Sequence, residues 1–123
     1  MAEIIVLDQF ARNIHRGSPL AYANDTLALA LAQEAVSSGA DIPLSPEERV
    51  FMYLPYMHSK SRVIHEVAEC LFKERAPQFN YDFELKHKAI IDRFGRYPHR
   101  NAMLGRQSTD EELAFLLQPG SSF

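Results

Sequence analysis

A stretch near the start of the chain carries an acid, two arginines and a histidine at helical spacing, with the amide of Asn13 among them. Asp8, Arg12 and His15 lie at positions i, i+4 and i+7, so they share one face of a helix, with Arg16 beside them. Asp8 can pair with Arg12, whose guanidinium offers a fixed fork of donors to the oxygens of an anion. The spacing therefore indicates an anion-binding face. The alternative is a solvated face, on which such a pair contributes only about 0.2–0.5 kcal/mol.

A second basic stretch lies late in the chain, over residues 93–106. It contains four arginines and His99 but no Asp or Glu, although the chain is acidic overall. Gly95 and Gly105 let the backbone turn and present N–H groups, and basic side chains on such a backbone form an anion-binding concavity. The alternative is that these arginines pair with the acids at 110–112 and fix the last helix.

We expect the two stretches to meet at one site, because both combine basic and amide groups beside glycine. A cluster of cations repels itself unless acids or a bound anion compensate it. Asp8 and His58 are predicted neighbours of the cluster. His99 is the best candidate for a general acid or base, since the pKa of free histidine lies near neutrality. The predicted ligand-binding residues are Asp8, Arg12, Asn13, Arg16, His58, Arg96, His99, Arg100, Asn101 and Arg106.

Motifs for metal sites and nucleophiles are weak or missing. Residues 65–69 read H-E-V-A-E, which resembles the zinc motif H-E-x-x-H but ends in Glu and has no evident third ligand. Glu84 and His87 have the E-x-x-H spacing of di-iron bundles, which need a second such motif, so His87 is better interpreted as a core histidine. No G-x-S-x-G, G-x-G-x-x-G or Walker-type loop occurs. No metal and no cofactor are predicted, and whether the protein is an enzyme stays open.

Apolar residues recur at helical spacing along nearly the whole chain, and these elements must position the polar groups. The clearest helix start is Ser45, followed three residues later by Glu48 as in a capping box. Pro55 predicts a kink or an end near Leu54. Strand and hairpin signals are nearly absent. We predict one all-α domain over residues 1–123, with about six helices in antiparallel hairpins because the loops are short.

The first and the last of the predicted helices each have a boundary that the sequence indicates. The first carries an apolar stripe and ends at Gly17. The stripe consists of Ile4, Leu7, Ala11 and Ile14. The last helix begins at Ser108, with Glu111 three residues later, and its leucines are predicted to face inward.

The composition fits one globular domain in a reducing compartment. The chain has 13 Lys and Arg, 16 Asp and Glu, one Cys and a formal net charge of −3. Such a charge argues against nonspecific binding to nucleic acids or membrane surfaces. No stretch is apolar enough for a membrane span or a signal peptide, and a single cysteine excludes an internal disulfide. These features predict a cytoplasmic protein with no nucleic-acid or membrane partner.

Several separate motifs occur in one order along the chain. They include Leu7-Asp8-Gln9-Phe10, Pro46-Glu47-Glu48-Arg49, Tyr53-Leu54-Pro55, Arg93-Phe94-Gly95-Arg96, Pro98-His99-Arg100-Asn101 and the closing Pro119-Gly120-Ser121-Ser122-Phe123. With these motifs over essentially its whole length, the sequence resembles the bacterial domain-of-unknown-function family numbered 924. The resemblance implies a tetratricopeptide-like α-α superhelix and no established activity.

The chain departs from the family pattern in ways that affect assembly and the site. Family members usually begin with an extra segment containing a Phe-Trp-Phe motif, and this chain starts where that segment would end. Ala11 stands where proline is usual. Positions that the family fills with acids and a glutamine are here Lys60, Ser61 and His65.

Without the extra segment, the first helix is expected to leave apolar residues uncovered. These residues are Ile4, Ile5, Leu7, Phe10 and Ile14. Because large exposed apolar patches tend to mark interfaces, we expect a homodimer.

Two functions remain open from the sequence. The polar motifs favour a binder of a small anionic ligand, a phosphate or a carboxylate, because a scaffold needs no cluster of arginine, histidine and asparagine. The helical fold and the missing nucleophile favour a tetratricopeptide-like module for protein interaction or self-association without catalysis. Fold alone does not decide between them.

Overall fold

Helices are the only regular secondary structure in the chain. The computed structural model describes residues 1–123 and contains no strand. In chain order the elements are α1 (Ala2–Ile5), the π-helical turn η1 (Val6–Phe10), α2 (Ala11–Ile14), the 3-10 turn η2 (Pro19–Tyr22), α3 (Asp25–Ser37), α4 (Pro46–Met57), α5 (Arg62–Arg75), α6 (Gln78–Phe94), the 3-10 turn η3 (Pro98–Arg100) and α7 (Asp110–Leu116). Because α1, η1 and α2 follow one another without a break, they form one first helix. The predicted all-α class with about six helices is confirmed.

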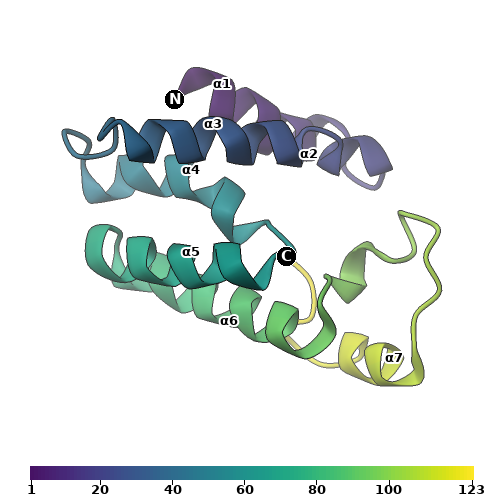
Figure 1. The fold of residues 1–123 in the computed structure, drawn as a ribbon. Helices are drawn as coiled ribbons and strands as arrows, with labels where there is room; N and C mark the ends of the chain where they lie inside the picture. Colours follow the sequence, from purple (N-terminus) through teal and green to yellow (C-terminus); the bar gives the residue numbers. More distant parts are fainter.

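Helices α3 to α6 run in alternating directions, and each packs on the next (Figure 1). The first helix packs on α3 and α4 at one side of the molecule, and α6 lies at the other side. After α6 the chain passes through η3 and a long loop to α7. The tail beyond α7 then returns to α6, where Phe123 contacts Phe83 and His87.

Helix α4 begins where the sequence predicts and ends later. The Ser45 side chain accepts a hydrogen bond from the Glu48 N–H at 3.2 Å, and the Glu48 carboxylate accepts one from the Ser45 N–H at 3.1 Å, which confirms the capping box. The helix continues past Leu54 and Pro55 as far as Met57. Pro55 and Met57 are both buried, so packing holds this last turn although proline provides no N–H.

Helix α7 begins one residue later than predicted. Its capping box uses Thr109 with Glu112, and not Ser108 with Glu111. The Ser108 hydroxyl is engaged elsewhere, because it accepts a hydrogen bond from the Asn101 side chain at 3.0 Å. Ser108 therefore holds Asn101 while Thr109 caps the helix.

Two apolar clusters form the interior. The larger one joins α1, α3, α4 and α5 through Ile4, Ala32, Val50, Met52, Tyr53, Tyr56, Met57, Ala68, Leu71 and Phe72. The smaller one, made of Ile90, Ile91 and Tyr97, holds α6 against the segment that follows it. None of the helices has the length and apolar character that a membrane span requires.

The first helix turns an acid toward the interior. Ile4 and Ala11 are buried as the predicted stripe requires, but Ile14 is 73% exposed and Asp8 is only 1% exposed. Asp8 lies in the π-helical turn η1, and such a turn adds a residue that rotates the following side chains about the helix axis. The predicted stripe is therefore interrupted, and a carboxylate occupies an interior position.

Candidate functional site

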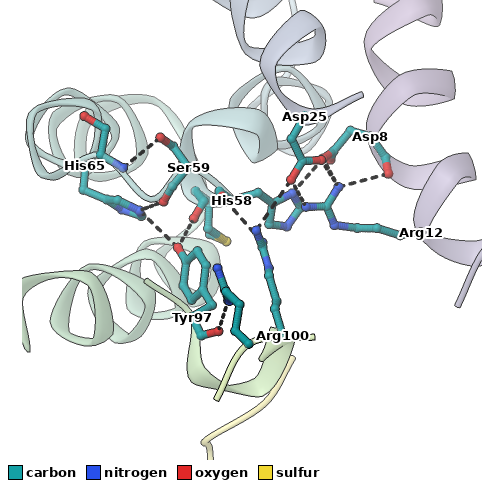
Figure 2. A network of polar contacts seen from close by, with 11 residues as sticks. Asp8, Arg12, Asp25, His58, Ser59, His65, Tyr97 and Arg100 are labelled. Atoms are coloured by element: carbon teal, nitrogen blue, oxygen red, sulfur yellow. Dashed lines mark hydrogen bonds and ion pairs between the residues drawn. The ribbon is translucent and has the colours of Figure 1, made fainter. Parts of the chain in front are cut away.

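The guanidinium of Arg12 lies between two carboxylates (Figure 2). Its Nη1 donates to Asp8 Oδ1 at 2.7 Å and to Asp25 Oδ1 at 2.8 Å, and its Nη2 donates to Asp25 Oδ2 at 2.9 Å. The pair with Asp8 is the one that the sequence predicts. The two-pronged pair with Asp25 connects the first helix to the first turn of α3. Arg12 is therefore fixed in place by the protein itself.

Asp8 also holds a histidine, since Nδ1 of His58, just beyond the end of α4, lies 2.7 Å from Asp8 Oδ1. Burial raises the pKa of Asp8, but the hydrogen bond and charge of His58 and the charge of Arg12 outweigh it and keep that pKa low. Burial lowers the pKa of His58 despite Asp8, and the charges of Arg12 and Arg100 lower it further. At pH 7 the Nδ1–H of a neutral His58 therefore donates to an ionised Asp8, and Nε2 is left to accept a proton or a hydrogen bond.

Arg100 is held flat between two tyrosines. Its guanidinium carbon lies 4.3 Å from the centroid of the Tyr22 ring and 4.5 Å from that of Tyr97. Its Nη2 donates to the His58 carbonyl at 3.3 Å, and its Nη1 lies 3.7 Å from Asp25 Oδ2. The buried Nε has no hydrogen-bond partner. Ring faces thus fix the position of Arg100, while its donors are only partly used by the protein.

A cavity of about 490 Å³ is lined in part by Arg12, Tyr22, His58 and Arg100. The first helix, η2, η3, α6 and the tail each contribute to its wall. Its lining residues are Gln9, Arg12, Asn13, Arg16, Gly17, Ala21, Tyr22, His58, His87, His99, Arg100, Met103, Ser122 and Phe123. Three of them are arginines, three are histidines and none is Asp or Glu. A concave wall with one sign of charge concentrates ions of the opposite sign.

The other two histidines of the wall are neutral at pH 7. Burial lowers the pKa of His87 to about 3, although Nδ1 lies 2.8 Å from the Phe83 carbonyl oxygen. Burial, with the charges of Arg100 and Arg12, lowers the pKa of His99 to about 4. In the folded chain the pKa of His99 thus lies well below that of free histidine, on which its choice as the candidate general acid or base is based. Its Nδ1 is buried without a hydrogen-bond partner, and the charges of Arg100 and Arg12 disfavour its protonation.

Three of the predicted site residues form a separate cluster beside α7. The Glu112 carboxylate accepts from Arg96 Nη2 at 2.6 Å, from Arg96 Nε at 2.9 Å and from Asn101 Nδ2 at 3.2 Å. Arg106 Nε donates to Asn101 Oδ1 at 3.0 Å. The hydrogen bond from Arg96 is the largest of the effects that together lower the pKa of Glu112 to about 2. For these residues the geometry matches the alternative interpretation, in which arginines pair with the acids of the last helix.

A second cavity, of about 860 Å³, adjoins the first. The wall residues common to both are Tyr22, His58 and Arg100. Of the predicted residues it adds Arg96 and Arg106, but its wall also includes the carboxylate residue Asp25. An acid in the wall works against anion binding, so the first cavity is the candidate site.

His65, the histidine of the H-E-V-A-E motif, is buried and makes its contacts inside the protein. His65 and Glu84 are both fully buried, and His65 Nδ1 lies 2.6 Å from Glu84 Oε1, while Nε2 lies 2.6 Å from the Ser59 carbonyl oxygen. Glu69, the last residue of the motif, instead lies 4.0 Å from Lys88. No group of three or more metal-ligating side chains forms. The pair of His65 and Glu84 therefore ties α5 to α6.

Sequence reasoning missed several residues of the site. Asp25 lies in the first turn of a helix, where an acid is common for helical reasons alone. His87 follows the apolar stripe of α6 and is buried, as predicted for a core histidine, yet it also lines the cavity. Tyr22, Met103 and Phe123 carry no local signal, because nothing in their spacing shows which distant segment they meet.

The comparisons with known proteins address the fold and leave the ligand open. The family model described as "Bacterial protein of unknown function (DUF924)" matches residues 1–120. Among solved structures, a protein of unknown function from Agrobacterium tumefaciens is similar, with 39% sequence identity and a TM-score of 0.89. The similarity covers 94% of this chain and 65% of that one, so the chain spans slightly less than two thirds of its length. None of the curated proteins matches the chain.

Proposed function

Because the chain belongs to the DUF924 family of bacterial proteins of unknown function, the family description supplies no activity, and we propose a function from the site. The protein binds a small anionic ligand, a phosphate or a carboxylate, in the cavity of about 490 Å³. One observation carries this proposal: three arginines line the wall, and none of the lining residues is Asp or Glu. A bound anion would compensate the charge that this wall concentrates.

The three arginines of the wall have complementary roles. Arg12 is fixed by Asp8 and Asp25, and Arg100 is fixed by its two tyrosines. Arg16 is exposed, lines the cavity and makes no ion pair within the protein, so its full fork of donors is available. Charge-assisted bonds from arginine to an oxyanion are shorter and stronger than neutral ones. Two arginines held by the protein and one exposed arginine without an ion pair therefore suit an anion with several oxygens.

Thermal unfolding in sulfate or phosphate at low ionic strength tests the proposal. A ligand at 100 times its Kd stabilises the folded chain by about 2.7 kcal/mol, so Tm should rise with added anion. Sodium chloride at equal ionic strength corrects for general screening. Without added anion, Arg16→Ala should have the same Tm as the wild type. Its Tm should not rise when sulfate or phosphate is added.

Arg62→Ala is the matched control, because Arg62 is also exposed and lies outside both cavities. This variant changes the net charge by the same amount, and its Tm should still rise with added anion. If the wild-type protein shows no stabilisation beyond that of chloride, the anion-binding function is wrong.

A second candidate function, self-association or partner binding by a tetratricopeptide-like module, has its own supporting observation. Val6, Phe10 and Ile14 lie four residues apart on the first helix and are 50%, 51% and 73% exposed. Of the apolar residues expected to be uncovered there, Phe10 and Ile14 are exposed and Ile4 is buried. An exposed apolar stripe of this kind favours an interface. The successive helical hairpins are the units from which such modules are built.

Sedimentation at high protein concentration tests the homodimer. The wild-type chain should sediment as a dimer and Ile14→Asp as a monomer. Leu117→Asp is the control, because Leu117 is 88% exposed but lies apart from the stripe, at the end of α7. A wild-type chain that stays monomeric would rule out self-association through the first helix.

A further inference from the structure

The candidate cavity is much larger than the anionic group that its arginines would hold. It measures about 490 Å³, whereas one water molecule takes up about 30 Å³ of liquid and a tetrahedral oxyanion equals only a few waters. Sites for organic ligands typically measure about 300–1,000 Å³. Most of the cavity is therefore left over for a part of the ligand that is not the anionic group.

The remaining wall is largely aromatic. The Phe123 ring stacks on the His87 ring, with centroids 3.8 Å apart and an angle of 26° between the planes. The Phe123 ring also lies nearly perpendicular to the ring of His99, at 6.0 Å between centroids. His87 covers one face of the ring, and Phe123 remains 48% exposed and lines the cavity. Met103, whose polarisable thioether favours contact with rings, lines the same cavity.

The charged groups and the rings belong to different sides of the molecule. Arg12, Asn13 and Arg16 are provided by the first helix or the turn after it, whereas His87 lies on α6 and Phe123 packs against it. The first helix and α6 lie on opposite sides of the fold (Figure 1). A ligand that fills the cavity therefore meets guanidinium and amide groups of the first helix and the turn after it as well as rings of α6 and the tail.

We propose that the ligand is an organic anion in which a flat ring carries a carboxylate or phosphate group. The ring packs against Phe123 in the wall of the cavity, and the oxygens lie on Arg12 and Arg16. This inference rests on the proposed anion binding and adds the class of ligand. Aromatic carboxylates and aryl phosphates share the required chemistry, and stacking on an aromatic side chain favours flat rings of either class.

Methyl NMR of the chain labelled at its four methionines provides the test. Met103 lines the cavity, whereas Met52 is buried in the core. Benzoate and phenyl phosphate should shift the Met103 methyl signal by their ring currents and leave Met52 unchanged. Benzoate should bind at least about tenfold more tightly than acetate and cyclohexanecarboxylate, which is about 1.4 kcal/mol. Phenyl phosphate should likewise bind at least about tenfold more tightly than inorganic phosphate. Comparing its affinity with that of benzoate identifies the preferred anionic group.

Phe123→Leu keeps the apolar bulk and removes the flat ring. It should abolish the preference for benzoate over cyclohexanecarboxylate and leave the affinity for inorganic phosphate unchanged. Phe51→Leu is the control, because Phe51 is similarly exposed, at 45%, and lies outside both cavities; it should bind as the wild type does.

The two proposals fail in distinguishable ways. If inorganic phosphate binds but the ring-bearing anions bind no more tightly than their ringless counterparts, the ring proposal is overturned and anion binding stands. A ring preference that survives in Phe123→Leu also overturns it. If no anion perturbs Met103 or stabilises the chain, both proposals fail together.

Discussion

Arg12 and Asp25 form a two-pronged ion pair, with N···O distances of 2.8 and 2.9 Å, between the first helix and the first turn of α3. Thirteen positions separate them along the chain, so the pair is a tertiary contact that joins two helices beside the cavity. Arg12 is therefore both a part of the structure and a proposed donor to the ligand. Stability and binding measurements on matched variants can separate these roles.

Arg12→Ala should lower the free energy of unfolding by about 2–3 kcal/mol, because it leaves the carboxylate of Asp8, which is 1% exposed, without its cation. Arg12→Lys should lower the free energy of unfolding by about half as much, since lysine keeps the charge but cannot make the two-pronged contact. Urea denaturation measures both. Arg16→Ala should change the value by less than about 0.5 kcal/mol. Wild-type stability in Arg12→Ala would show that the ion pairs contribute nothing.

His58 should be neutral at pH 7, with its proton on Nδ1, because that nitrogen faces the Asp8 carboxylate. Nitrogen-15 NMR of the imidazole reports the tautomer directly. Asp8→Asn should lower the pKa of His58 further, since the charge of Asp8 is one of the effects that raise it. A proton on Nε2, or an unchanged pKa in the variant, would contradict this assignment.

Stability should fall as pH decreases from about 6.5 toward 4. The pKa values of His87 and His99 are about 3 and about 4 in the folded chain, against about 6.5 when unfolded. On acidification these histidines therefore take up protons at a higher pH in the unfolded chain than in the folded one. Their contribution to stability is fully present above about pH 6.5 and is lost as the pH falls. Urea midpoints at pH 7 and pH 5 measure the effect, and His87→Gln should reduce it.

Sulfate should weaken this pH dependence, because a bound anion raises the pKa of both histidines and sulfate keeps its charge over this range. The pKa values of Asp8 and Glu112 lie below their ordinary 3.8 and 4.5, so these acids titrate at lower pH. An equal loss of stability with and without sulfate would argue against an anion beside His87 and His99.

Glu112→Gln should loosen α7 without affecting the cavity. It removes the charge that holds Arg96 and weakens the contact with Asn101, so hydrogen-exchange protection in α7 should fall by about tenfold. Stabilisation by sulfate should remain. Glu111→Gln, on an exposed pair with Arg93, is the control. If Glu112→Gln instead loses the response to sulfate and keeps its protection, then Arg96, Asn101 and Arg106 belong to the binding site.

Local chemistry explains what could be predicted from the sequence. The capping box of Ser45 and Glu48 and the pair of Asp8 and Arg12 each lie within one helical turn, where spacing determines contact. The all-α class follows from repeated apolar spacing for the same reason. Even here one local feature escaped prediction: the π-helical turn that places Asp8 in the interior has no signature in the apolar pattern.

The sequence could not show which residues of the late basic stretch line the cavity and which belong to the cluster with Glu112. Arg96 pairs with Glu112 of α7 and Arg106 donates to Asn101, whereas His99 and Arg100 line the cavity. The stretch is a loop with a single 3-10 turn, so no period tells which side chains share a direction. The partners that decide it, Glu112 and Tyr22, are identified only by the tertiary fold.

The walls of the cavity are drawn from segments that are far apart in the chain. Its contacts span 13 positions between Arg12 and Asp25, 42 between His58 and Arg100 and 50 between Asp8 and His58. Closing loops of this length costs entropy before the contacts form, so we expect the cavity to assemble after the helical hairpins, late on the folding route. An anion that recognises only the finished cavity gains little in the transition state. It should slow unfolding and leave the folding rate nearly unchanged, so the lifetime of the native chain would increase with the concentration of its ligand.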